Sequence, residues 1–125
     1  MTIGFSRNLA LFLGIVTPLL ETVRRWSTWR DDPPALFDDY VLSAFLLYGA
    51  WRVGKDPGSG QRFLTAAWGV AFGMVFLSFF GQLYAMRQGQ SDPAPVSSEW
   101  VAVVKGVGLL IVIVGLISSL RKIDA

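Results

Sequence analysis

Four apolar stretches, separated by polar and proline-containing segments, make up most of the chain. The longest of them, residues 63–85, contains no charged side chain. A helix of this length, rising about 1.5 Å per residue, crosses a bilayer core of about 30 Å. Shorter stretches occupy residues 5–23, 39–54 and 99–120. The pattern predicts an all-α integral membrane protein, folded as a single four-helix bundle with short loops.

The first stretch, residues 5–23, has two unlike faces at helical spacing. Gly14 and Glu21 lie on a small and polar face, whereas Phe12 and Leu19 lie on a bulky apolar face. Because helices approach closely where side chains are small, we expect the small face to meet protein and the bulky face to meet lipid. No small-residue cleavage pattern follows, so an uncleaved first span is expected.

Small residues also lie on one face of the other stretches, including the pattern Gly69-x-x-x-Gly73 in the third. This spacing allows a second helix to approach closely. The candidate helix-packing positions are Gly14, Gly69, Gly73, Gly108 and Gly115. Packing within the bundle is the first interpretation, and self-association through the third stretch is the alternative.

The links between the stretches carry strong turn signals. Adjacent prolines in residues 24–38 predict a break in any helix there. Asp38 and Asp39 are expected to cap the second helix, with a role as paired carboxylates or cation ligands as the alternative. Residues 54–62 predict a tight polar loop. One of two adjacent serines before Glu99 is expected to cap the last helix.

Basic residues predict the orientation. With four spans, both termini lie on one side of the membrane. The basic residues on that side are Arg7, Arg52, Lys55, Arg62, Arg121 and Lys122, and those near span ends on the other are Arg24, Arg25, Arg30 and Arg87. The side richer in Lys and Arg faces the cytoplasm, so both termini are expected there.

Aromatic side chains near the ends of the stretches suit the membrane interface. The candidate lipid-interface residues at the outer surface are Trp26, Trp29 and Trp100, with Arg24 close to Trp26 in the sequence. Those at the inner surface are Trp51 and Trp68. We interpret Arg24 and Arg25 beside these tryptophans as an interfacial anchor, with binding of anionic lipid or a partner as the alternative.

Composition narrows the possible functions. Charged residues make up 16% of the chain, against about 25% in ordinary soluble domains, which fits lipid as the solvent. The net charge is only +2, so nucleic acid is not an expected partner. Cys and His are absent, which excludes thiolate and histidine metal sites and the usual nucleophile–base pairs. We therefore expect no enzyme, no metal and no cofactor.

Ionisable residues recur near the outer ends of three stretches, where charge is costly. They are Glu21, Asp39 and Lys105, and Arg25 and Gln82 are further polar candidates. Three interpretations stay open. One is an outward-facing polar pocket for an ion, a lipid head group or a small solute. Another is an ion pair that locks the bundle, with nearby charged residues of the first two stretches as possible partners of the lysine. The third is a lysine whose side chain reaches for the membrane interface.

The run FDDYVLSAFLLYGAWR, followed by AAWGVAFGMVFLSFFGQL, resembles a group of small uncharacterised bacterial four-span membrane proteins. This resemblance covers about a third of the chain. It implies the bacterial inner membrane and no particular activity.

The chain also resembles the small multidrug-resistance transporters, which are four-span dimers built around a carboxylate in span one. Glu21 would be the matching carboxylate, and Gly108 and Gly115 match two glycines in that family's last helix. Glu21 lies nearer the end of its span than the family's carboxylate, and Lys105 has no counterpart there.

These observations favour a non-catalytic multi-pass membrane protein that acts by helix–helix association. Its partners would be membrane lipids and either further copies of itself, in a homo-oligomer, or another membrane protein, to which it would be a small accessory subunit. The competing hypothesis is a small dimeric transporter or channel for a small solute or ion, which would use an outward-facing polar pocket.

Overall fold

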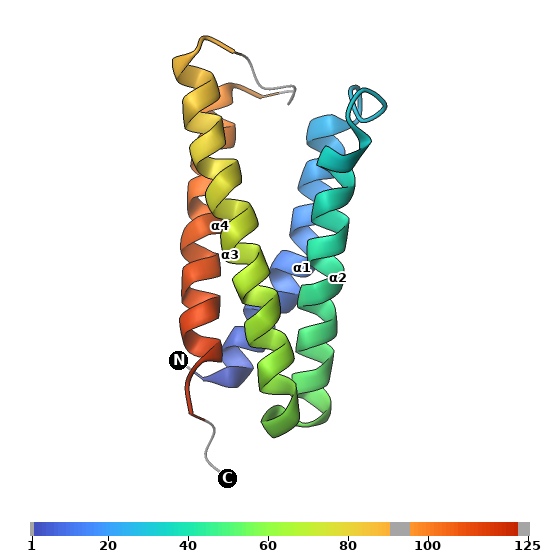
Figure 1. The fold of residues 1–125 in the computed structure, drawn as a ribbon, viewed down its shortest axis with the longest axis vertical. Coiled ribbons are helices and arrows are strands. Elements are labelled where there is room, and N and C mark those ends of the chain that lie inside the picture. The colour runs from blue at the N-terminus through green and yellow to red at the C-terminus, as the bar shows by residue number, and fades with distance from the viewer. Residues whose placement is uncertain (1, 91–95, 123–125) are drawn as a thin grey trace.

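The computed structural model describes residues 2–90 and 96–122, and within them the chain forms four helices (Figure 1). The helices are α1 (Ile3–Arg25), α2 (Pro33–Lys55), α3 (Pro57–Arg87) and α4 (Ser98–Ser119). The predicted all-α bundle is therefore confirmed. Consecutive helices run in opposite directions, so α1 begins and α4 ends at the same end of the bundle (Figure 1). We call this the terminal end, and the other, beside residues 26–32, the distal end.

Three of the four helices, α1, α3 and α4, are long and apolar enough to span a membrane. The protein is thus a helical membrane protein. α2 has the same length as α1, 23 residues. It is not among the three, and charged residues lie near both of its ends: Asp38 and Asp39 near its start, and Arg52 and Lys55 near its end.

The start of α2 differs from the prediction. The helix begins at Pro33, with Asp32 at the N-cap position, and the adjacent prolines occupy its first turn. Proline is well suited to this position because the first N–H groups of a helix have no acceptor within the helix. Asp38 and Asp39 therefore lie inside α2, and the expectation that they cap it was wrong.

The polar loop predicted for residues 54–62 was also wrong. α2 continues to Lys55 and α3 begins at Pro57, so only Asp56 separates them. The Asp56 carboxylate accepts a hydrogen bond from the Gly58 N–H at 3.2 Å and caps α3. A Cβ atom on Gly60 would lie 2.5 Å from the Val53 nitrogen, so glycine there lets the two helices meet. Helix capping and close approach thus replace the loop.

The start of α4 agrees with the prediction. Ser97 is the N-cap, and its hydroxyl accepts a hydrogen bond from the Trp100 N–H at 3.4 Å. Glu99 lies in the first turn, where a negative charge is favourable to the helix dipole. The local signal therefore fixed this helix boundary.

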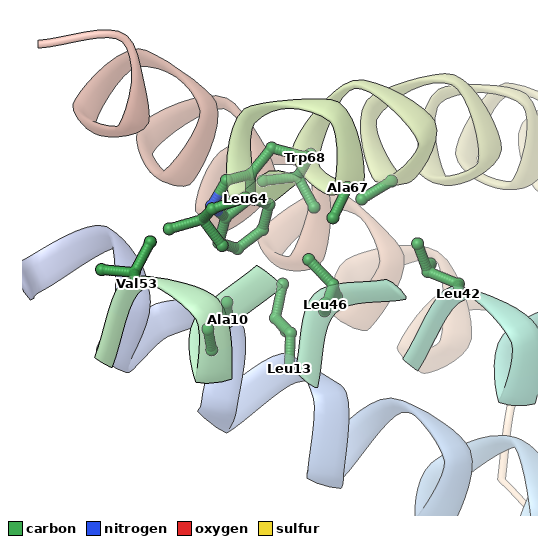
Figure 2. Packing of buried hydrophobic residues seen from close by; sticks show 11 residues of the cluster. Ala10, Leu13, Leu42, Leu46, Val53, Leu64, Ala67 and Trp68 are labelled. Carbon is green, nitrogen blue, oxygen red and sulfur yellow. The ribbon is translucent and has the colours of Figure 1, made fainter. Parts of the chain in front are cut away.

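The core joins all four helices, with Val112 as the fully buried contribution of α4. Figure 2 shows Leu64 and Trp68 of α3 facing Leu13 of α1 and Leu46 of α2. Trp68 is fully buried, so its expected place at the membrane interface was wrong. Gly115 of α4 provides the room, because a Cβ atom there would lie 2.6 Å from Cη2 of the indole ring.

Hydrogen bonds close the terminal end. The Trp68 indole N–H donates to the Ser6 hydroxyl at 2.8 Å, and that hydroxyl donates to the Gly115 carbonyl, also at 2.8 Å. Gln61 and Ser119 link α3 to α4 in the same region, through a bond of 2.8 Å from the Gln61 amide to the Ser119 carbonyl. Because these buried polar groups satisfy one another, α1, α3 and α4 are held together at this end.

Candidate functional site

A cleft of about 780 Å³ separates the α1–α2 pair from the α3–α4 pair. The two pairs meet near the terminal end and diverge toward the distal end (Figure 1). The walls of the cleft are mostly apolar. Six of the side chains that line it are Leu13, Val16 and Leu20 of α1, Val75 of α3, and Val104 and Ile111 of α4. The cleft therefore has the apolar surface that binding sites for small organic molecules usually have.

A compact ionic group lies where the cleft reaches the distal end of α1. Glu21 accepts hydrogen bonds from Arg24 at 2.8 Å and from Arg25 at 3.1 Å. All three residues line the cleft. Their spacing places them on neighbouring turns of one helix, which is the geometry of favourable ion pairs. The two arginines also lie in the last turn of α1, where positive charge is favourable to the helix dipole.

Two carboxylates from α2, Asp38 and Asp39, line the same part of the cleft. Asp39 interacts electrostatically with Glu21 and with both arginines of α1. The Thr22 and Tyr40 hydroxyl groups form a hydrogen bond between α1 and α2 beside them. The helix pairing thus brings α2 carboxylates next to the ionic group of α1.

Lys105 of α4 lines the cleft from the opposite pair of helices. Its ammonium group donates to the Gln82 side-chain oxygen at 3.2 Å and to the Ser78 carbonyl at 3.5 Å. Gln82 is only 6% exposed, and its amide donates to the Ser98 carbonyl at 3.4 Å. These bonds tie the lysine to polar atoms of α3.

The polar residues singled out from the sequence are therefore brought to one place. Glu21, Arg25, Asp39 and Lys105 come from three helices and line a single cleft, and Gln82 holds the lysine. Among the described residues, the charges that line the cleft are balanced. The basic residues are Arg24, Arg25 and Lys105, and the acidic ones are Glu21, Asp38 and Asp39.

The predicted packing glycines fall into three groups. Gly14 faces Leu47 of α2, whose Cδ2 atom lies 2.8 Å from the position of an added Cβ, and Gly115 faces the indole ring described above. Gly108 lines the cleft with no atom within 4 Å of such a Cβ. Gly69 and Gly73 likewise have no atom within 4 Å, so they do not contact the other helices of this chain.

The predicted interface residues are mostly on the surface. Trp26, Trp51 and Trp100 are exposed, and Trp29, which is partly buried, lies 5.5 Å from the guanidinium of the neighbouring Arg30. Trp100 also lines the cleft. Arg24, by contrast, points to Glu21, so its part in the ionic group accompanies any role as an anchor.

Sequence reasoning missed the hydroxyl groups that position the cleft. Ser6 was not singled out, although it precedes Ala10 and Gly14 on the small face of α1. Small-residue spacing was thus the available signal. No comparable signal marked the bond between Thr22 and Tyr40, because it depends on how α1 and α2 pair.

Among residues 2–90 and 96–122, no group of three or more acidic side chains is placed to hold a metal ion. No protein-family model, curated protein or solved structure compared with the chain matches it.

Proposed function

We propose that this protein is a non-catalytic multi-pass membrane protein that binds a small organic molecule in the cleft between its helix pairs. The observation that carries the proposal is the gathering of four polar residues from three helices, Glu21, Arg25, Asp39 and Lys105, around one apolar cleft. Its volume of about 780 Å³ lies within the range of about 300–1,000 Å³ typical of ligand pockets.

Each wall of the cleft supports polar groups of its own. Glu21 bonds to Arg24 and Arg25 within α1, and Lys105 bonds to Gln82 and Ser78 of α3. Because both walls present polar groups beside apolar surface, the cleft suits a molecule that has both kinds of surface.

We further propose that the cleft opens toward the outside of the bacterial inner membrane. In this arrangement α2 crosses the membrane together with the three apolar helices, and both termini are cytoplasmic. Cations near the terminal end support it, because Arg52 lies 4.2 Å above the Phe63 ring and Lys55 lies 5.7 Å from the Trp51 ring. Such cation–aromatic pairs are typical of an interface where lysine and arginine extend toward water.

Transport of the bound molecule is the fuller form of this proposal. It requires the terminal end to open in turn, which would break the hydrogen bonds of Ser6 with Trp68 and Gly115. Binding alone leaves that network intact. Flux measured in proteoliposomes therefore separates a transporter from a protein that only binds its ligand.

Association with a second membrane protein, or with a further copy of this one, is the second candidate function. Gly69 and Gly73 support it, because both are exposed on α3 and an added Cβ at either would meet no atom of the other described helices within 4 Å. Glycine pairs of this spacing let a neighbouring helix approach closely.

A matched pair of variants tests both candidates. Gly108→Leu fills the cleft, whereas Gly69→Leu places the same side chain on the outer face of α3, and both positions have open space. Native mass spectrometry of protein extracted with its lipids measures bound small molecules and subunit number together. We expect Gly108→Leu to lose the bound molecule and Gly69→Leu to retain it.

The other results are equally informative. Loss of a dimer or of a second protein in Gly69→Leu alone would favour association as the main function. Retention of the bound molecule in Gly108→Leu would overturn the cleft as the binding site.

A further inference from the structure

The cleft is apolar at its deep end and charged at its distal end. The deepest α1 residue that lines it is Phe12, and Glu21 lies at its charged end. By helical rise these positions are about 14 Å apart. An apolar slot of this depth below a charged mouth matches an amphiphile whose chain lies along the helices and whose head group lies at the interface.

The charged mouth carries donors and acceptors for both parts of a zwitterion. Arg25 bonds to Glu21 through Nε at 3.1 Å. The two terminal nitrogens of the guanidinium remain as donors, in the planar arrangement that suits a phosphate. Asp38 and Asp39 supply carboxylate oxygens, which accept hydrogen bonds from an ammonium group.

From this arrangement we infer that the ligand is a phospholipid with a primary ammonium head group, of the phosphatidylethanolamine type. One acyl chain lies between the helix pairs, the phosphate contacts Arg25, and the ammonium contacts the α2 carboxylates. This inference rests on the proposed binding function and adds the class of ligand to it.

Charge balance favours this class over its competitors. The cleft-lining charges among the described residues are equal in number. A zwitterionic head group, whose own two charges cancel, keeps this balance, whereas an anionic head group does not. A quaternary ammonium group has no N–H to donate, and such groups are bound in cages of several aromatic rings. Among the described residues, the aromatic side chains that line this cleft are Phe12 and Trp100. Phe12 lies at the deep end of the cleft, so Trp100 alone does not form such a cage at the charged mouth.

The experiment uses the full-length protein in mild detergent and three synthetic lipids with identical acyl chains. Their head groups are ethanolamine, glycerol and choline. Native mass spectrometry under competition gives the relative affinities. Since one charge-assisted hydrogen bond changes affinity by about tenfold, we expect a preference of about tenfold for the ethanolamine lipid over each of the others.

Two variants with matched controls locate the recognition. Asp39→Asn removes an ammonium acceptor, and its control, Asp31→Asn, makes the same change at an exposed residue outside the cleft. Arg25→Gln removes the phosphate donors while Arg24 still pairs with Glu21, and Arg30→Gln is its control. We expect the first variant to lose the preference for ethanolamine, the second to weaken all three lipids, and both controls to bind as the original protein.

The outcomes distinguish this inference from the proposed function. Equal binding of the three lipids, abolished by Gly108→Leu, would overturn head-group recognition and keep the cleft as a binding site. A bound molecule other than a phospholipid would do the same. Lipid binding that Gly108→Leu leaves unchanged would overturn both, because the lipid would then lie outside the cleft.

Discussion

The indole N–H of Trp68 donates a hydrogen bond to the hydroxyl of Ser6 at 2.8 Å, although the two residues belong to α3 and α1. Both side chains are fully buried. The Ser6 hydroxyl also donates to the Gly115 carbonyl of α4. One serine therefore joins three helices at the end of the bundle opposite the mouth of the cleft, and it fixes the base from which the helix pairs diverge.

Removing that hydroxyl should destabilise the protein through the stranded indole. We expect Ser6→Ala to lower the free energy of unfolding by about 1–3 kcal/mol, since a buried donor loses its acceptor. Trp68→Phe removes the donor and leaves the hydroxyl its carbonyl partner. If the bond matters, the double variant is less destabilised than the sum of the two single changes, as thermal unfolding in detergent would measure. Strict additivity would contradict the coupling.

The contact between Gly115 and Trp68 predicts a second effect on stability. Gly115→Ala places a methyl group 2.6 Å from Cη2 of the indole. Overpacking of this kind costs about 1–3 kcal/mol. The matched control is Gly73→Ala, where no atom lies within 4 Å, and the better helix propensity of alanine should leave stability unchanged or slightly higher. Equal melting temperatures for the two variants would show that the ring moves freely.

These glycines illustrate how far the sequence could predict the structure. Spacing placed Gly73 and Gly115 on small-residue faces with equal justification. Which of them meets a neighbour depends on the rotation of each helix about its axis, and the spacing of residues within one helix does not determine that rotation. The faces were therefore predictable, but their partners were not.

For the cleft, too, the polar positions on each helix were predictable, but the way the helices meet was not. The sequence placed Glu21, Asp39 and Lys105 near the outer ends of three predicted helices, and the structure gathers them around one cleft. The divergence of the helix pairs had no local signal. It depends on the close contact at Gly60 and on the buried bonds of Ser6, both of which join residues from different helices.

Lys105 and Gln82 should be coupled in stability. Gln82→Leu removes the side-chain acceptor that lies 3.2 Å from the ammonium group, in a position only 6% exposed. We expect a loss of about 1–2 kcal/mol, because a partly buried charged donor loses a hydrogen bond. Lys105→Met removes the charge and retains most of the length of the chain. In thermal unfolding, the variant that carries both changes should lose less stability than the sum of the losses in the two single variants. No coupling would indicate that the lysine is held by other contacts.

Cysteine labelling can test the path of α2 through the membrane, because the natural chain contains no cysteine. Ser27 lies in the segment between α1 and α2, and Ser59 lies in the first turns of α3, beyond the end of α2; both are exposed. If α2 is the fourth span and the termini are cytoplasmic, Ser27→Cys reacts with a membrane-impermeant maleimide applied to the outer face of the membrane. Ser59→Cys then reacts only after the membrane is opened, and the unsubstituted protein reacts in neither case.

The labelling pattern distinguishes a reversed orientation of the protein from a failure of α2 to cross the membrane. Reaction of Ser59→Cys from outside, with Ser27→Cys protected, would reverse the orientation and keep the four spans. The charged end of the cleft is lined by Arg24 and Arg25, which directly precede the segment that holds Ser27, and it would then face the cytoplasm. Reaction of both variants from the same side would mean that α2 does not cross, because the two serines lie at opposite ends of that helix. The charges near both ends of α2 would in that case keep it at the membrane surface.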